Sequence, residues 1–406
     1  MVAPMGGGPT TPQLVAAVGD AGGLGFLAGG YKTADQVAEE IRVVRSLSSA
    51  PFAVNLFVPI ALAPEQAARV PAYARALEVR ARHLEAAVGE PIHGDDHLAA
   101  KVAVVLAERP HAVSFTFGLP EVEVIDRLHR AEVCVLVTVT STAEARQAAS
   151  AGVDGLVVQR REAGAHRGGF DDLDGDEQMG LLPLLRLIHR QVDLPLVAAG
   201  GLGDGAGVAA VLVAGAYAAM LGTAFLRCPE AGTSAVHKAA LADPHATVVT
   251  RAFTGRRARA LKNAFTDTYG GLAPGAYPEV HYVTAPLRAA ARQRGEIDDM
   301  HLWGEGRMSW PNRFLPARAS WYGNWWREHE KRWRRRCGRH LARESYEPRT
   351  AAPSQPTELD GLVEETSDGG RHHRWLERLE DHIPGPGGQG LFPALRVPLL
   401  GHQDDP

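Results

Sequence analysis

The sequence predicts an α/β protein, an eight-stranded (β/α)8 TIM barrel with a helical insertion, followed by a largely irregular C-terminal tail. Short runs of Val, Leu, Ile and Ala recur along residues 1–306, as expected for strands that are buried on both faces of a parallel sheet. Amphipathic segments such as 142–151 and 205–215 separate these runs. This alternation favours a barrel, although an open doubly wound sheet has the same local pattern.

The predicted strands follow one another along the chain, each followed by a helical segment. Their ranges are 2–5, 24–28, 52–58, 112–117, 134–140, 155–159, 194–199 and 218–225. The first helix begins at Thr10-Thr11-Pro12, which offers a hydroxyl cap and a first-turn proline. Residues 64–89 form an extra helical segment between the third and fourth strands. We therefore predict a barrel that carries one helical insertion.

The overall composition is that of an ordinary globular chain. Of the 406 residues, 45% are hydrophobic and 22% are charged, and the formal net charge is −4, so we expect neither nucleic-acid binding nor membrane association. The three cysteines are far apart and fit no metal or redox spacing, so we expect no metal site. No apolar run approaches the ~20 residues that span a bilayer, and the N-terminus lacks the regions of a signal peptide. These features predict a cytoplasmic protein.

The composition changes abruptly near Gly306. Six of the seven tryptophans follow it, together with a basic run at 331–336 and a Pro- and Gly-rich stretch at 384–390. No segment after residue 350 alternates at a helical or strand period. We therefore divide the chain into a barrel domain, 1–306, and a tail of low order, 307–406, which we expect to form no compact domain.

The tail has three possible interpretations. Its residue types have codons rich in G and C, which favours a frameshift near codon 306 of a GC-rich gene. A second interpretation is a segment that binds nucleic acid or a partner, with Trp325, Trp326 and Trp333 as stacking surfaces. The third is a solvated extension with no specific role.

Glycine and small polar residues gather where the predicted strands end, which is the face that carries the active site in barrels. Gly200-Gly201 follows the seventh strand, and Gly222-Thr223 lies in the eighth. Both supply backbone N–H groups that a phosphate can approach, and barrel phosphate sites usually lie after these two strands. The alternative is that these glycines only form tight turns. A dinucleotide fingerprint at 201–206 is disfavoured, because Gly222-Thr223 stands where a ribose-binding acid is expected.

These same residues carry a resemblance to a known family. Ordered blocks across 1–306 resemble those of the nitronate monooxygenase (2-nitropropane dioxygenase) family, and nothing beyond 306 does. The blocks include Pro4-Met5-Gly6-Gly7, Val54-Asn55-Leu56, Phe117-Gly118-Leu119-Pro120, Glu162-Ala163-Gly164-Ala165-His166-Arg167-Gly168, Ala198-Ala199-Gly200-Gly201, Leu221-Gly222-Thr223-Ala224-Phe225, Phe253-Thr254-Gly255-Arg256 and Leu302-Trp303-Gly304.

The resemblance implies an FMN-binding barrel that oxidises alkyl nitronates with O2 to carbonyl compounds and nitrite. The expected partners are thus a small nitronate or nitroalkane and O2, and the expected cofactor is FMN. By position, His166 would be the catalytic histidine. The residues implied at the cofactor are Pro4, Met5, Gly6, Asn55, Gln159, Gly164, Gly200, Gly201, Met220, Leu221, Gly222 and Thr223, the segment 220–223 being the one at the phosphate.

The chemistry of a nitronate is consistent with this set. A nitronate is already an anion, so it needs an electron acceptor and a group that holds its charge. The His166 imidazole can hydrogen-bond to nitronate oxygens or act as a base toward a neutral nitroalkane. The alternative is a structural histidine, and Asn55 and Gln159 could likewise only satisfy buried backbone groups.

The sequence departs from the family at several points. The family usually has Gly where this chain has Arg160 and Ala165, and Gln where it has Met220. We expect the methyl group of Ala165 to tilt the histidine loop. The family also begins before its Pro-Met-Gly block, so we expect a first strand without its N-terminal part and a start codon assigned too late.

Two other functions compete with nitronate oxidation. A flavin-dependent enoyl-acyl-carrier-protein reductase shares the barrel, the FMN site and a similar histidine loop, and it would consume NADH. A degenerate FMN-binding protein without turnover is the other, because both ends of the barrel domain look damaged. The insertion at 64–89 and the loop sequence at 162–168 favour the monooxygenase over the reductase.

Overall fold

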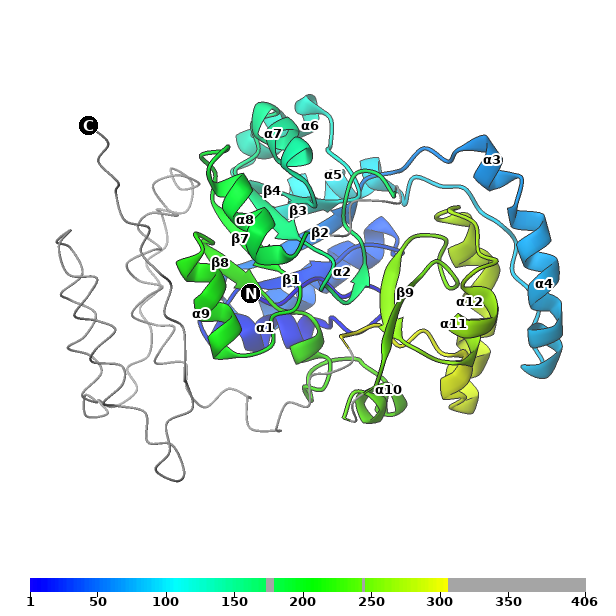
Figure 1. The fold of residues 1–406 in the computed structure, drawn as a ribbon. Coiled ribbons are helices and arrows are strands. Elements are labelled where there is room, and N and C mark those ends of the chain that lie inside the picture. The colour runs from blue at the N-terminus through cyan, green and yellow to red at the C-terminus, as the bar shows by residue number, and fades with distance from the viewer. Residues whose placement is uncertain (173–178, 243–244, 306–406) are drawn as a thin grey trace, which may run out of the picture. The chain divides into compact units, whose positions relative to one another are not determined.

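Parallel strands form the central sheet of the computed structural model, which describes residues 1–172, 179–242 and 245–305. The predicted tail, 307–406, lies outside these residues. The sheet runs in the order β1-β2-β3-β4-β5-β7-β8 (Figure 1). Its strands are β1 (Gly25–Ala28), β2 (Phe52–Phe57), β3 (Ala112–Thr116), β4 (Cys134–Val139), β5 (Gly155–Gln159), β7 (Leu196–Ala199) and β8 (Ala218–Met220).

The first residues of the chain connect the two ends of this sheet. Val2 forms parallel bridges with both Gly25 and Leu221. Its N–H donates to Leu24 O at 3.0 Å, and the Leu221 N–H donates to Met1 O at 3.0 Å. Residues 1–3 thus take the place of the first barrel strand, and the predicted (β/α)8 barrel is confirmed.

The strands at this junction are shorter than the sequence predicts. The first, expected over 2–5, is reduced to the bridges at Val2, because the chain turns away through Gly7 and Gly8, which have φ of +80° and +116°. The last, expected over 218–225, ends at Met220 and is followed by the 3-10 helix η1 (Thr223–Phe225).

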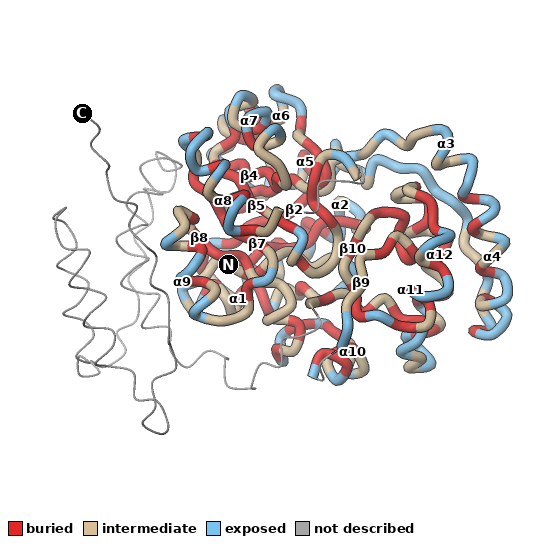
Figure 2. The backbone as a smooth tube through the Cα atoms, in the orientation of Figure 1, coloured by how far each residue is buried: buried red, intermediate tan, exposed pale blue. Residues whose placement is uncertain are grey.

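Helices follow the strands and cover the outside of the sheet, so that strand residues are buried and the outer helix faces are exposed (Figure 2). The predicted cap of α1 is present, since the Thr11 hydroxyl accepts a hydrogen bond from Leu14 N ahead of Pro12. The helices of the barrel are α1 (Pro12–Asp20), α2 (Ala34–Leu47), α5 (Leu98–Glu108), α6 (Val122–Arg130), α7 (Thr142–Ser150), α8 (Leu181–His189) and α9 (Gly205–Val213). Among the described residues, no helix is long and apolar enough to cross a bilayer.

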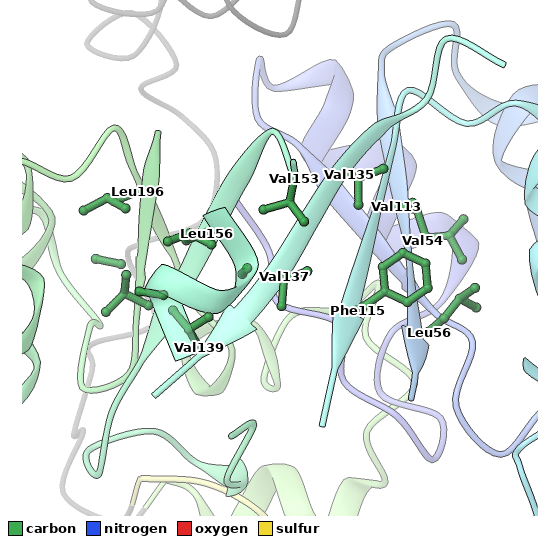
Figure 3. Close-up of a cluster of buried hydrophobic side chains, with 14 of the residues drawn as sticks. Val54, Leu56, Val113, Phe115, Val135, Val137, Val139, Val153, Leu156 and Leu196 are labelled. Atoms are coloured by element: carbon green, nitrogen blue, oxygen red, sulfur yellow. The ribbon is translucent and has the colours of Figure 1, made fainter. Parts of the chain in front are cut away.

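Strand residues alternate between two buried clusters. One set, including Val54, Val113 and Val137, packs with residues of the outer helices (Figure 3). The other set, including Phe26 and Leu136, forms a cluster made almost entirely of strand residues. This alternation follows from the period of two in a strand, and it places apolar side chains on both faces of the sheet.

A second core lies outside the barrel, and the sequence predicted only part of it. The predicted insertion is present as α3 (Pro64–Ala67) and α4 (Val70–His83), and α4 packs against α12 (Glu279–Arg294). A small antiparallel sheet in the order β6-β10-β9 was not predicted. Its strands are β6 (Ala165–His166), β9 (Thr247–Thr250) and β10 (Ala258–Leu261), and α10 (Ala235–Ala240), α11 (Ala264–Tyr269) and η2 (Ile297–Asp299) complete the region. We call this region the outer lobe.

Candidate active site

A cavity lies at the C-terminal ends of the barrel strands and is also lined by residues of the outer lobe. Every predicted site residue except Gly201 and Leu221 lines it. Leu221 instead pairs with residues 1–3 at the barrel junction, and the Gly201 N–H donates to the last described residue, Glu305. The predicted residues that line the cavity are His166, Pro4, Met5, Gly6, Asn55, Gln159, Gly164, Gly200, Met220, Gly222 and Thr223.

Asn55 and Gln159 form hydrogen bonds that orient their amide groups. Asn55 is 2% exposed, and its Nδ2 donates to Ser114 Oγ at 2.9 Å and to Thr116 Oγ1 at 2.8 Å. Gln159 Nε2 donates to His166 O at 3.1 Å, while its Oε1 accepts from Gly168 N at 2.8 Å. Gln159 therefore holds the histidine loop at two points, which is the backbone-satisfying role left open for it above.

His166 lies on β6, where it pairs with Ala258 of β10. The preceding residue, Ala165, has φ of +60°, a left-handed conformation that glycine adopts without steric cost. A residue that departs from the family thus stands where the backbone favours glycine. The His166 ring is flanked by Phe117, Tyr277 and Trp303, with ring centroids at 5.9, 5.8 and 5.4 Å.

Thr254 is the hydrogen-bond partner of the His166 ring. Its Oγ1 lies 2.9 Å from His166 Nε2 and donates to Arg256 O at 3.3 Å. Because that hydroxyl proton is directed to the carbonyl, we assign the His166 proton to Nε2, which leaves the lone pair on Nδ1. Burial, then the charges of Arg256 and Arg288, lower the pKa of His166 to about 3. The ring is therefore neutral at ordinary pH.

Arg256 holds the histidine loop through two hydrogen bonds to its backbone. Its side chain is 1% exposed, Nε donates to Arg167 O at 2.8 Å, and Nη2 donates to Gly169 O. The guanidinium carbon lies 4.2 Å from the centroid of the Phe117 ring. Because Arg256 binds carbonyls on either side of residue 168, it determines the path of the chain immediately after His166.

An unpredicted cationic wall faces the same cavity from α12. Arg288 is 9% exposed and its Nη2 donates to His281 O at 2.7 Å, while Nε donates to Thr284 Oγ1 at 3.0 Å. Within the described part of the chain it forms no ion pair. Burial lowers the pKa of Arg288 to about 10, so the side chain still carries its charge at neutral pH. A buried, unpaired guanidinium at a cavity is suited to an anionic ligand.

Aromatic side chains complete this wall. The ring of Tyr31 stacks on that of His281 at 4.0 Å with an interplanar angle of 2°, and Tyr277 Oη donates to Tyr31 Oη at 3.1 Å. Burial, then the charge of Arg288, lower the pKa of His281 to about 2. Sequence reasoning missed His281 and Arg288, because α12 follows no barrel strand and no motif marks it. It also missed Tyr31, although that residue closely follows the barrel strand β1.

Backbone N–H groups of two loops meet at one carboxylate. The N–H groups of Gly164 and Gly201 both donate to Glu305 Oε1, at 3.2 and 3.0 Å, and the Glu305 N–H donates to Thr223 Oγ1 at 3.3 Å. We call these two amides and the Thr223 hydroxyl the anion cradle. Space here is tight, since a Cβ on Gly164 would lie 3.0 Å from Gly304 Cα. At this position the backbone amides of two loops already bind a carboxylate.

Comparisons with known proteins identify the family of this chain. The family model for nitronate monooxygenase matches residues 1–317. A nitronate monooxygenase of Paraburkholderia phytofirmans is 39% identical over 327 residues, covering 78% of this chain and 88% of that protein. A probable nitronate monooxygenase of Staphylococcus saprophyticus is 37% identical over 305 residues, covering 73% and 85%.

Solved structures with a similar fold include a nitroalkane oxidase and an enzyme named FabK. The nitroalkane oxidase of Streptomyces ansochromogenes is 48% identical, with a TM-score of 0.73, and the match covers 75% of this chain and 88% of that one. FabK of Thermotoga maritima is 24% identical with a TM-score of 0.56, covering 75% and 84%, which is a likeness of fold alone. The match to the family model and the identity to its members together show that this chain belongs to the nitronate monooxygenase family.

Proposed function

We propose that this chain is an FMN-dependent oxidoreductase that oxidises alkyl nitronates with O2 to carbonyl compounds and nitrite. One observation carries the proposal: a neutral histidine and a buried, unpaired arginine line the same cavity as Gly164 and Thr223 of the anion cradle. His166 and Arg288 provide a site for a small anion, and the cradle provides a separate site for a phosphate. Membership of the family supports the reaction class.

The anion cradle supports a cofactor with a single terminal phosphate. The Glu305 carboxylate is a stand-in anion there, so the amides of Gly164 and Gly201 would hold the FMN phosphate, with the Thr223 hydroxyl beside them. Asn55 and Gln159, whose amides are already oriented, would face the rest of the cofactor. When bound, the flavin supplies the electron acceptor for the nitronate.

The protein's own residues would bind and orient the substrate. Arg288 offsets the negative charge of a nitronate, and the neutral His166 ring does not add a second positive charge. With its Nε2 proton directed to Thr254, the ring presents Nδ1 as an acceptor, which can remove the α-proton of a neutral nitroalkane. The aromatic rings around His166 exclude water from this position.

The test begins with the purified full-length protein. We expect FMN to copurify without a covalent bond, and O2 to be consumed with propionate 3-nitronate but not through NADH oxidation with crotonyl thioesters. Mass spectrometry of the released cofactor and an oxygen electrode check this. FAD or no flavin would refute the cofactor assignment. NADH consumption would indicate an enoyl reductase, and bound FMN without O2 uptake a degenerate protein.

A histidine variant then tests the catalytic assignment. We expect His166→Asn to retain flavin and to lower turnover by about 10²–10⁴-fold, most of all with neutral nitroalkanes, because these need a proton removed. His129→Asn is the matched control, since His129 Nε2 bonds to Asp154 at 3.0 Å on the outer helix α6, away from the cavity. Equal turnover of the two variants with both substrate forms would make His166 structural.

A further inference from the structure

Glu305 occupies the anion cradle through a single oxygen. Two N–H groups from different loops, after β5 and after β7, converge on Oε1. Oε2 is buried and has no hydrogen-bond partner among the described residues. A carboxylate with one unsatisfied buried oxygen is a poor match for its surroundings, whereas a phosphate brings three acceptor oxygens to the same donors.

The electrostatic surroundings also disfavour the charged form of the Glu305 carboxylate. Burial, together with the charge of Glu162, raises the pKa of Glu305, and the cradle amides and Arg259 only partly oppose the rise. Arg259 forms no ion pair with it; that guanidinium donates to Thr247 Oγ1 at 2.8 Å and to Arg161 O at 2.8 Å. The carboxylate is held chiefly by backbone dipoles, which would serve another anion equally well.

The segment that carries Glu305 is anchored independently of its side chain. Leu302 O accepts from Leu261 N at 2.8 Å, and Gly304 N donates to Arg259 O at 3.4 Å. Trp303 forms a bridge with Ala260 of β10. Since these contacts are all to backbone, rotation of the Glu305 side chain alone can free the two cradle amides without detaching the segment, while the Glu305 N–H stays on Thr223 Oγ1.

We propose that Glu305 is an internal competitor for the cofactor phosphate: its carboxylate holds the anion cradle closed until a phosphate displaces it. This inference rests on the proposed function in one respect, that the phosphate is that of FMN. Two anions cannot share the same two amides, so binding requires the carboxylate to leave. The apparent affinity for FMN is then reduced by the fraction of molecules whose cradle is filled by Glu305.

Binding of two flavins to the full-length apoprotein tests the inference. Titration followed by flavin fluorescence gives dissociation constants for FMN and for riboflavin, which lacks the phosphate. We expect Glu305→Ala to tighten FMN binding by about tenfold or more and to leave riboflavin binding within about twofold, with Glu305→Gln intermediate because its amide oxygen can still accept both N–H groups. Glu123→Gln, on the exposed face of α6, controls for overall charge. Unchanged or weaker FMN binding in Glu305→Ala would overturn the proposal.

A second measurement keeps the test independent of flavin binding. Inorganic phosphate should raise the thermal midpoint of the Glu305→Ala apoprotein more than that of the parent protein, since the cradle is open in the variant. If neither flavin binds any variant, the proposed function fails, and the phosphate response alone decides whether Glu305 competes for the cradle. Equal phosphate responses of parent and variant would overturn it. Glu305→Gln serves in both measurements if the alanine variant does not fold.

Discussion

Replacement of Arg256 by Met tests how the histidine loop is held in place. The change removes two hydrogen bonds from a charged donor to the buried carbonyls of Arg167 and Gly169 and a cation–π contact with Phe117. Hydrogen bonds to charged groups contribute about 1.5–3 kcal/mol each, and the ring contact about 0.5–2 kcal/mol. The variant no longer bears the cost of burying a charged group, the same burial that lowers the pKa of Arg256, and this offsets part of the sum. We therefore expect a loss of about 3 kcal/mol in unfolding free energy.

Urea unfolding of the apoprotein measures this loss, and turnover with a nitronate reports on the loop. Arg256→Lys should fall between the parent and Arg256→Met, because an ammonium lacks the planar fork that reaches both carbonyls. Arg190→Met, at an exposed position after α8, is the matched control, with an expected change within about 0.5 kcal/mol. A loss below about 1 kcal/mol in Arg256→Met, at unchanged denaturant slope, would refute the reasoning.

Three further predictions follow from other contacts. Thr254→Val should lower turnover of neutral nitroalkanes about tenfold or more while flavin binding is retained, because Nε2 loses its partner, and Thr254→Ser should restore it; steady-state kinetics decides. Lys101→Met leaves the Asp96 carboxylate unpaired and should cost about 3–5 kcal/mol in urea unfolding, which Lys101→Met with Asp96→Asn should partly recover. Burial lowers the pKa of His237 to about 4. Between pH 6.5 and 4 the unfolded chain therefore takes up the proton before the folded chain does. The free energy of unfolding decreases as the pH is lowered through this range, by about 2 kcal/mol at pH 5. Calorimetry across this range should show a flatter profile for His237→Gln.

The barrel was predictable because its signals are local. Continuous apolar runs predict buried parallel strands, and the runs at 52–58 and 134–140 match β2 and β4 to within one residue. Strand length at the barrel junction was not predictable, because one bridging residue, Val2, replaces a whole strand. A single residue that pairs with strands on both sides produces no alternation of apolar and polar residues from which a strand could be predicted.

The outer lobe was hidden for a different reason. β6 consists of only two residues, Ala165 and His166, so no alternation marks it. On α12 the buried face contains Glu279, Thr284 and Arg288 as well as apolar residues. Polar residues on a buried face weaken the periodic signal of an amphipathic helix, and these are the side chains that bring charge to the cavity.

Some residues of the candidate site were predictable from the sequence and others were not. Glycine and hydroxyl groups at strand ends were predictable, since barrels place function there. The role of Glu305 was not, because its carboxylate meets Gly164 and Gly201 only after residues 141 and 104 positions away along the chain are brought together. Contacts at such separations depend on tertiary packing, which no local pattern encodes.

The helical insertion packs against the part of the outer lobe that contacts the candidate catalytic histidine. The consecutive residues 252–254 link α4 and α12 to His166. Tyr73 Oη of α4 donates to Ala252 O at 2.6 Å, and Thr284 Oγ1 of α12 donates to Phe253 O at 2.5 Å. Thr254 Oγ1 in turn lies 2.9 Å from His166 Nε2. The barrel supplies the loop that carries His166, but the packing of α4 on α12 positions the hydroxyl that orients its ring. Because the same helix α12 carries Arg288, we infer that this packing contact positions both the ring of His166, the proposed base, and the Arg288 guanidinium. The proposed catalytic constellation depends on rigid elements on both sides of the cavity, and we infer that the insertion stabilises the side formed by the outer lobe.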